Sequence, residues 1–370
     1  MEKTQKQFLQ ILSRFSLEGK VSSVEPFGNG HINDTLKVTV DGGEEKYVLQ
    51  RINHAIFKDV DKLQQNIHTV TSHIRRRLEE TGEMDIDRKV LTFLPAENGK
   101  YYHFDGNNYW RVCLFIPHSK SYEEINTEKA FEAGQAFGHF QTMLADLSEE
   151  SLGETIPNFH NMEFRLTQFR EAVSADMICR TKKVQELIAA IEKRAESMCI
   201  QEKLYREGKL IKRVNHCDTK VNNILFDEKD GSLLCVIDLD TVMPGFVLSD
   251  YGDFIRTGAN TGAEDDPDLD RIGVNMEIFR AYTRGYLETA SFLTPTEINL
   301  LPYGARLLTY MQAVRFLTDY INGDTYYKIQ YPEHNLVRTR AQFKFLLSLE
   351  THAEEMCLEV SRLKGNGKRN

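Results

Sequence analysis

Apolar and polar residues alternate with two different periods in the first third of the chain, one typical of helices and one typical of strands. Helical spacing predicts a short amphipathic helix over residues 8–15 and a longer one over residues 59–80. A period of two predicts strands. These lie at residues 21–27, 35–40, 47–52, 90–94, 101–104 and 108–116. Pro117 follows the last strand and cannot extend a hydrogen-bonded ladder, so we expect a hinge there.

Beyond residue 117 most apolar residues recur with helical periodicity. The pattern predicts helices at residues 127–147, 163–172, 182–206, 274–290, 296–321 and 338–364. Three short strands interrupt them at residues 211–214, 224–226 and 233–237. The sequence therefore predicts an α+β fold with two lobes. The N-lobe spans residues 1–116 and is mostly antiparallel sheet, and the C-lobe spans residues 117–370 and is mostly helical.

A polar motif lies between the first two of these short strands. His216, Asp218 and Asn223 follow the order H-x-D-x-x-x-x-N, and the hairpin that comes next delivers Asp238. Phosphoryl transfer requires a carboxylate near the acceptor hydroxyl and hard oxygen ligands for Mg²⁺. Kinases space a base aspartate, a metal-binding asparagine and a metal-binding aspartate in this way. The alternative is a solvated hairpin with incidental acids.

The segments HCDTKVNNIL (216–225) and VIDLD (236–240) resemble the aminoglycoside phosphotransferase superfamily of small-molecule kinases. The resemblance implies a bilobal, protein-kinase-like fold and an ATP- and Mg²⁺-dependent transfer. It also implies that Asp218 is the catalytic base and that Asn223 and Asp238 bind the metal. Cys217 stands where protein kinases carry arginine, which argues against a protein kinase regulated through its activation loop.

The N-lobe supplies candidates for nucleotide binding. Gly28, Asn29 and Gly30 form a loop whose backbone can approach phosphate oxygens. Backbone groups at Phe115 and Ile116, beside the hinge, would face adenine. The third strand lacks the usual lysine. Gln50 and Arg51 lie on opposite faces of it, and we favour Arg51 as the phosphate-binding cation.

The predicted helix over residues 59–80 carries no glutamate near its centre, where kinases hold the strand cation, and Gln64 lies there instead. Two acids near the motif are ambiguous. Asp240 is either a second metal ligand or a surface acid. Asp250 is expected to brace the catalytic loop and His216 to do the same, rather than to take part in the chemistry.

Composition narrows the class of protein. The 370 residues carry a net charge of −9 and 27% charged residues, which argues against a nucleic-acid or anionic-membrane partner. Six scattered cysteines form no C-x-x-C pair, so we expect reduced thiols. Without an apolar signal core or a membrane-spanning run, we expect a cytoplasmic protein, monomeric or weakly dimeric.

Further stretches resemble the N-acetylhexosamine 1-kinases of the same superfamily. They are FGNGHIN (27–33), VLQRIN (48–53), TVMPG (241–245) and NGDTYY (322–327). This resemblance implies a sugar substrate phosphorylated at its anomeric hydroxyl, with His31, Asp218, Arg315 and Tyr326 as contacts. Arg315 could instead pair with Asp319, and Tyr326 could simply pack on the lobe.

Two other functions remain open from the sequence. One is a kinase for a different small hydroxyl compound, such as homoserine, choline, methylthioribose or an aminoglycoside. The other is a nucleotide-binding pseudokinase that acts as a partner-binding module, which the missing strand lysine and helix glutamate keep open.

Overall fold

The computed structural model describes residues 5–28 and 32–366, and the chain divides into two compact units. The first unit comprises residues 1–122, 146–157 and 222–243. The second comprises residues 123–145, 158–221 and 244–370. The hairpin at residues 222–243 belongs to the first unit, although it lies far beyond the boundary predicted at residues 116–117.

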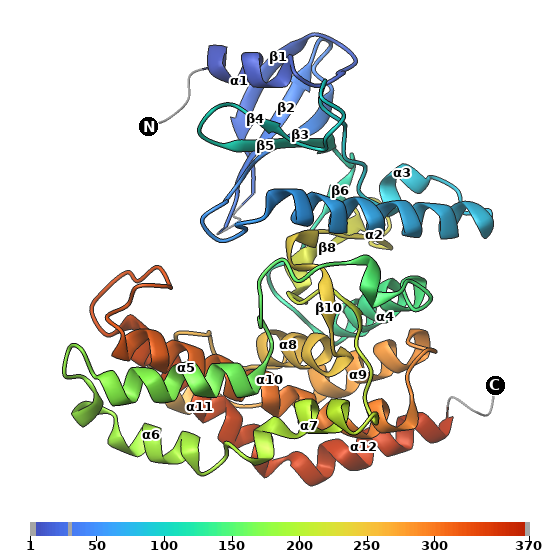
Figure 1. Cartoon of the computed structure of the whole chain (residues 1–370). Helices are drawn as coiled ribbons and strands as arrows, with labels where there is room; N and C mark the ends of the chain where they lie inside the picture. The colour runs from blue at the N-terminus through green and yellow to red at the C-terminus, as the bar shows by residue number, and fades with distance from the viewer. Residues whose placement is uncertain (1–4, 29–31, 367–370) are drawn as a thin grey trace. The chain divides into compact units, whose positions relative to one another are not determined.

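The first unit is built on an antiparallel sheet with the strand order β1-β2-β3-β5-β4 (Figure 1). The strands are β1 (Val21–Pro26), β2 (Asp34–Val40), β3 (Glu45–Ile52), β4 (His103–Phe104) and β5 (Tyr109–Leu114). A second, three-stranded sheet contains β6 (Ser119–Lys120), β8 (Ile224–Asp227) and β9 (Leu233–Val236), in the order β6-β8-β9. The helices of this unit are α1 (Gln5–Leu12), α2 (Val60–Glu80) and α3 (Ile86–Lys89).

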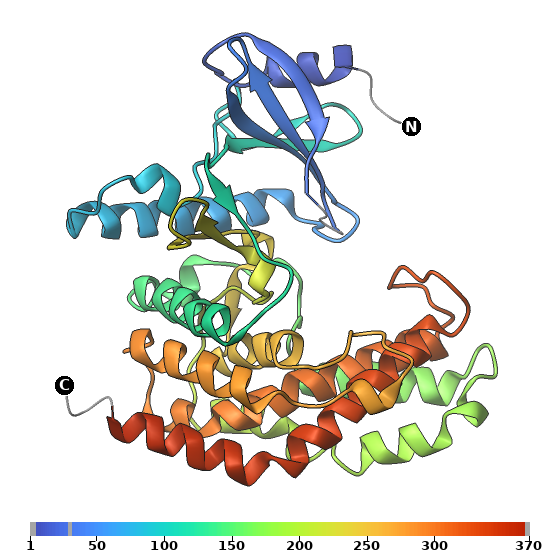
Figure 2. The same ribbon diagram turned by 180° about the vertical axis from the view of Figure 1, so that it is seen from behind.

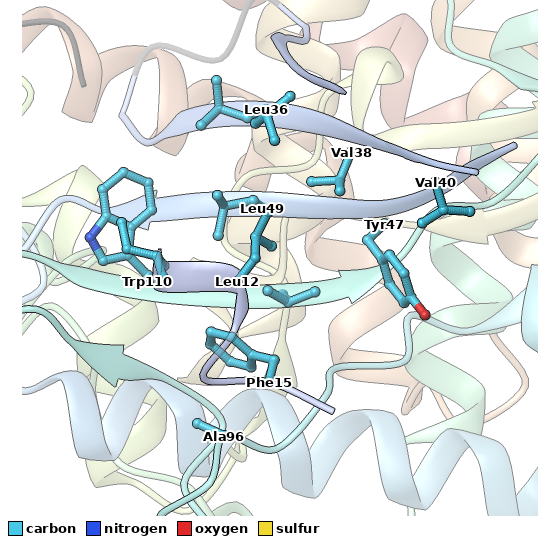
Figure 3. Packing of buried hydrophobic residues seen from close by; sticks show 12 residues of the cluster. Leu12, Phe15, Leu36, Val38, Val40, Tyr47, Leu49, Ala96 and Trp110 are labelled. Atoms are coloured by element: carbon cyan, nitrogen blue, oxygen red, sulfur yellow. The ribbon is translucent and has the colours of Figure 1, made fainter. Parts of the chain in front are cut away.

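One face of the five-stranded sheet is apolar because β2 and β3 alternate as predicted. Val38 and Leu49 are fully buried there, and Leu12 of α1 packs against the same face (Figure 3). Trp110 lies in this cluster, with the ring of Phe8 packed edge-on at 6.0 Å. Trp110 therefore packs in the core of this sheet, and α1 closes the core on this side.

The segment at residues 90–94 does not form the strand that its apolar residues predict. α3 ends at Lys89 and the chain then runs beside β5, with a single bridge between Phe93 and Cys113. The Leu94 N–H donates to the Val112 carbonyl, but Pro95 has no N–H with which to continue the ladder. The alternating apolar pattern therefore produces one β-bridge instead of a strand, because Pro95 cannot donate the next hydrogen bond of the ladder.

The second unit is mainly helical (Figure 2). Its helices are α4 (Thr127–Met143), α5 (Met162–Ala175), α6 (Gln185–Glu192), α7 (Ile200–Arg206), α8 (Val247–Gly258), α9 (Met276–Thr289), α10 (Pro295–Ile321), α11 (His334–Thr351) and α12 (Ala353–Asn366). β7 (Arg213–Asn215) precedes the catalytic motif, and β10 (Met243–Gly245) precedes α8. α10 begins with a reciprocal capping box between Thr294 and Glu297.

Two predicted helices are interrupted. The one expected at residues 182–206 is split into α6 and α7, with a 3₁₀ turn (Ser197–Cys199) between them. The one expected at residues 338–364 begins earlier, at His334, and consists of α11 and α12 separated at His352. Within the described part of the chain, no helix is both long and apolar enough to cross a bilayer.

Small residues allow α4 and α9 to approach closely. A Cβ added to Gly285 of α9 would lie 2.0 Å from the Phe131 carbonyl oxygen, and one added to Gly134 of α4 would lie 2.2 Å from the Tyr282 carbonyl oxygen. The glycines of these two helices therefore serve close packing. This pair of helices supports the catalytic loop, because α4 also supplies Gln141, described below.

Candidate active site

A buried carboxylate fixes the loop that carries Asp218. Asp250 of α8 accepts the backbone N–H groups of His216 and Cys217, each at 2.8 Å, and the side-chain amide of Gln141 at 2.8 Å. Burial raises the pKa of Asp250 to about 6, and the N–H donors oppose this rise because they favour the charged form. The prediction that Asp250 braces the catalytic loop is confirmed.

The loop itself has an unusual backbone. Cys217 has a φ of 64°, in the left-handed region that residues with a side chain rarely adopt. His216 is fully buried between the rings of Phe137 and Phe140, and its Nδ1 accepts the N–H of Asp218 at 3.3 Å. His216 thus braces the loop, as predicted, and its Nδ1 carries no proton in this arrangement.

Asp218 is held in reach of a small acceptor. Its carboxylate pairs with Lys220 at 2.7 Å, and 24% of its side chain is exposed. The negative charge of Asp218 raises the pKa of Lys220, so the lysine stays protonated beside the carboxylate. A partly exposed carboxylate on a rigid loop can accept a proton from a bound hydroxyl.

The two predicted metal ligands lie on neighbouring parts of the first unit. Asn223 directly precedes β8 and Asp238 follows β9, and the N–H of Ile237 donates to the Asn223 carbonyl at 2.9 Å. Asp238 has a φ of 60°, which turns the chain out of the strand direction. One amide oxygen and one carboxylate fit Mg²⁺, which prefers few hard protein ligands and takes its remaining oxygens from phosphate and water.

Asp240 is not a surface acid. It lies in a 3₁₀ turn (Leu239–Thr241) instead of an extended strand, so alternation does not give its direction. Its buried carboxylate accepts Arg111 Nη1 at 2.5 Å and Asn33 Nδ2 at 2.5 Å. The first unit therefore contains a buried ion pair between β5 and the segment that follows Asp238.

Arg51 lies on the face of the sheet away from this ion pair. Gln50 pairs with Arg111 across β3 and β5, and its side chain accepts Arg111 Nε at 2.9 Å. Arg51 points to the opposite face and pairs with Asp34 at 2.6 Å. Only one of the two residues can face the nucleotide, and Gln50, not Arg51, lies on the face that carries the buried ion pair. The nucleotide-binding role of Arg51 stays a prediction.

The remaining nucleotide-binding candidates are partly defined. Gly28 has a φ of 75°, which favours glycine, whereas Asn29, Gly30 and His31 lie outside the described residues. At the hinge, the Phe115 N–H donates to the Lys46 carbonyl, and the Ile116 carbonyl accepts the Ser119 hydroxyl. Among the described residues nothing bonds the Phe115 carbonyl or the Ile116 N–H, and these are the two groups that the edge of an adenine ring could use.

Arg315 and Tyr326 come together in the second unit. The Arg315 guanidinium lies over the rings of Phe159, Tyr326 and Tyr327, at 5.1, 5.9 and 5.6 Å. Tyr326 is 60% exposed, so it does not pack into the core. The proposed salt bridge to Asp319 does not form, because Asp319 accepts the backbone N–H groups of residues 325–327 and thereby shapes the loop that carries Tyr326.

Two further residues complete this cluster. Burial lowers the pKa of Arg165 to about 10, and the positive charge of Arg315 acts in the same direction. Burial also lowers the pKa of His160 to about 3, Arg315 and Arg165 act in the same direction, and the Asp218 carboxylate acts in the opposite one. His160 Nδ1 is buried and has no partner within the described ranges. We name Phe159, His160, Arg165, Arg315, Tyr326 and Tyr327 the acceptor cluster.

Sequence reasoning missed several of these residues. Arg111 sits in a strand whose neighbours are apolar, and only the register with Gln50 reveals its partners. Phe159, His160 and Arg165 lie in and just before α5, in a segment without a recognisable motif. Their association with Arg315 depends on how helices pack, so the sequence offers no signal for it.

The described loop, hairpin and sheet define a kinase-like phosphotransferase. Solved structures share this fold. An aminoglycoside phosphotransferase from Alicyclobacillus acidocaldarius is 12% identical with a TM-score of 0.60, and the match covers 94% of this chain and 96% of that one. A spectinomycin phosphotransferase, solved with ADP and spectinomycin, is 13% identical with a TM-score of 0.53 and covers 96% and 100%. Choline kinase from Streptococcus pneumoniae is 14% identical with a TM-score of 0.51 and covers 93% and 98%.

The sequence itself supports a closer assignment. The family model of the phosphotransferase enzyme family matches residues 23–290, which is more than half of the chain. The chain belongs to this family, and the resemblance inferred from residues 216–225 and 236–240 is confirmed at the level of the family.

Proposed function

We propose that this protein transfers the γ-phosphoryl group of ATP to the anomeric hydroxyl of an N-acetylhexosamine, GlcNAc or GalNAc, and releases the sugar 1-phosphate. Membership of the phosphotransferase family supports the reaction class. The resemblance of residues 27–33, 48–53, 241–245 and 322–327 to N-acetylhexosamine 1-kinases supports the acceptor. Nucleotide use is supported by the ADP that the related spectinomycin phosphotransferase binds.

The observation that carries the choice of acceptor is the chemistry of the acceptor cluster. It combines aromatic faces with guanidinium groups. The negative charge of Asp218 acts on the pKa of His160, which belongs to the cluster. Sugars present an apolar ring face that stacks on aromatic side chains, and they present hydroxyl and acetyl oxygens that accept N–H bonds. A neutral, oxygen-rich acceptor fits these donors.

The charge of the cluster disfavours the cationic acceptors of related kinases. Arg165 bonds the Phe159 carbonyl and Gln168, and Arg315 bonds Gln312. In the described part of the chain neither guanidinium pairs with a carboxylate. Two uncompensated positive charges repel choline, ethanolamine and aminoglycosides, because like charges at a partly desolvated site cost several kcal/mol.

The chain's own residues supply the chemistry at the acceptor. Asp218 orients the acceptor hydroxyl and accepts its proton, and Lys220 pairs with that carboxylate at 2.7 Å. Asn223 and Asp238 would hold Mg²⁺, which when bound neutralises charge on the phosphates. Positioning accounts for most of the rate, since a loose phosphoryl-transfer transition state gains little from a strong base.

A second candidate acceptor is a small hydroxy amino acid such as homoserine, whose carboxylate would pair with the guanidinium groups and offset the repulsion of its ammonium group. The absence of a carboxylate partner for Arg165 and Arg315 within the described residues favours it, because paired guanidinium groups bind carboxylates well. An acidic acceptor would complete the charge balance that the cluster lacks.

The test is a phosphorus-NMR assay of product with ATP, Mg²⁺ and a panel of acceptors: GlcNAc, GalNAc, glucosamine, homoserine, choline and kanamycin. We expect an anomeric sugar phosphate from the N-acetylhexosamines, and at least tenfold slower turnover of cationic glucosamine. Product from homoserine alone would replace the sugar assignment. ATP binding with no product from any acceptor would favour the pseudokinase interpretation.

Arg315→Met links the result to the cluster. We expect a rise of at least tenfold in the KM for the acceptor, with the KM for ATP nearly unchanged. Arg284→Met is the matched control, because Arg284 also lies over an aromatic ring, that of Phe131 at 4.3 Å, but on α9 and outside the cluster. Equal effects of the two substitutions would remove Arg315 from the acceptor site.

A further inference from the structure

Among the described residues of the first unit, β3 and α2 do not form the ion pair that kinases use to orient the phosphates of ATP. In kinases a strand lysine contacts the phosphates and is held by a helix glutamate. Here Gln50 stands on β3 and Gln64 on α2, and both are neutral amides. This face of the sheet nevertheless carries one positive and one negative charge, because Arg111 and Asp240 form a buried ion pair on it.

Both amides act as partners of Arg111. Its Nε donates to Gln50 Oε1 at 2.9 Å, and its Nη1 donates to Asp240 at 2.5 Å. With its amide turned so that both ends are satisfied, Gln64 accepts from Arg111 Nη1 at 3.2 Å and donates to the Tyr101 carbonyl at 3.2 Å. The guanidinium is thus oriented by a strand, a helix and the segment after Asp238.

Burying this ion pair costs free energy of folding, which suggests that the pair is kept for a function. Arg111 is 2% exposed and Asp240 is 3% exposed, and removing two charges from water costs several kcal/mol per ion. Hydrophobic residues of similar volume often stabilise a protein as well as a buried ion pair does. The third guanidinium nitrogen, Nη2, bonds nothing within residues 5–28 and 32–366, so two N–H donors of a rigid cation are available for an oxyanion.

Asp240 also reaches the end of the glycine loop. Asn33 donates its side-chain amide to Asp240, and its Oδ1 accepts the N–H of Asn53 at 2.9 Å. The carboxylate therefore ties the residue that follows the loop to the turn that follows Asp238. Any shift of this carboxylate would disturb both segments together.

We propose that Arg111 is the cation that positions the nucleotide phosphates in this protein, and that Asp240 takes the place of the helix glutamate as its partner. Arg111 directs Nη2 to a phosphate oxygen. Asp240 acts as a positioning residue, because its pairing couples the orientation of Arg111 to the backbone that carries Asp238. The proposal depends on membership of the phosphotransferase family and not on the identity of the acceptor.

The test measures binding of ADP by calorimetry, with and without Mg²⁺ and without any acceptor. We expect Arg111→Met to weaken ADP binding at least tenfold under both conditions, and Arg111→Lys to recover part of that loss because it restores a positive charge. Asp240→Asn keeps the shape of the side chain, and we expect it to reduce the Mg²⁺-dependent gain in ADP affinity at least fivefold. Arg14→Met removes an exposed ion pair with Glu97 in the same unit and should bind ADP like the wild type.

The outcomes are decisive even if one variant does not fold. Folded Arg111→Met and Asp240→Asn that bind ADP within twofold of the wild type, with the same Mg²⁺ dependence, would overturn the proposal. If Arg111→Met does not fold, an unchanged Mg²⁺ dependence in Asp240→Asn overturns it alone. Loss of ADP binding in Arg51→Met with normal binding in Arg111→Met would return the role to Arg51. Because no acceptor is present, failure of the sugar assignment cannot produce any of these results.

Discussion

At the scale of single residues, the catalytic motif depends on side chains that do no chemistry. Asp250 accepts two backbone N–H groups of the loop, and His216 accepts a third. These bonds hold Cys217 at its positive φ and so fix the direction of Asp218. The position of Asp218, the proposed base, is therefore set by Asp250 and His216, which bond the backbone of its loop.

Replacing Asp218 tests its role as the base. Asp218→Asn removes the proton acceptor but keeps the size of the side chain, so we expect turnover to fall by roughly 10²–10⁴-fold. ADP affinity should change little, which calorimetry can verify. Asp230→Asn, in the exposed hairpin turn, is the control and should retain full turnover. A variant at position 218 with a tenth or more of wild-type turnover would show that the base lies elsewhere.

At the scale of elements, close helix packing holds the second unit together where α4 meets α9. The helices approach so closely that backbone carbonyl oxygens occupy the positions of missing Cβ atoms. α4 also delivers Gln141 to Asp250, so the position of this helix affects the catalytic loop. Packing and catalysis are linked here through one buried amide.

Gly285→Ala tests this packing. The new methyl group would lie 2.0 Å from the Phe131 carbonyl oxygen, so the helices must separate. Overpacking of this kind costs about 1–3 kcal/mol or more, which denaturant unfolding would detect as a lower free energy of unfolding. Gly273→Ala is the control, because a Cβ there meets nothing closer than 3.6 Å. Equal stability of the two variants would mean that α4 and α9 lie farther apart.

At the scale of the whole molecule, the acceptor cluster makes stability depend on pH. Burial and the positive charges of Arg315, Arg165 and Arg256 lower the pKa of His160 from 6.5 to about 3. Below pH 6.5 the unfolded chain binds a proton at this residue while the folded protein does not. Protonation of His160 in the unfolded chain therefore does not affect the free energy of unfolding above pH 6.5, but it lowers this free energy progressively as the pH falls toward 3.

We expect His160→Asn to remove this dependence. Between pH 6.5 and 4.5 the free energy of unfolding of the wild type should fall by about 1.4 kcal/mol per pH unit more than that of the variant. Urea unfolding at several pH values measures the difference, and proton NMR should show a His160 ring signal that does not titrate between pH 8 and 5. Parallel pH profiles for the two proteins would contradict the assigned environment of His160.

Local patterns were sufficient for much of the fold. Alternating residues predicted β2, β3 and β5, and helical spacing predicted α2, α4 and α10, because each element buries one face whatever its neighbours are. The spacing of Asp218, Asn223 and Asp238 indicated the family because it is a local property of one loop and one hairpin. Patterns failed at residues 90–94, where Pro95 has no N–H to continue the ladder, and at residues 182–206, where a 3₁₀ turn interrupts the helix.

The sequence by itself determined the reaction class, since a catalytic loop and its hairpin are short enough for their spacing to be read directly. Only the tertiary structure decided which cation lies on the polar face of the sheet, because strand register pairs Gln50 with Arg111 and leaves Arg51 with Asp34. It likewise decided that Arg165 and His160 join Arg315, residues separated by well over a hundred positions in the chain. Periodicity gives the face of an element, but charge partners across strands and helices follow from packing, which local sequence does not encode.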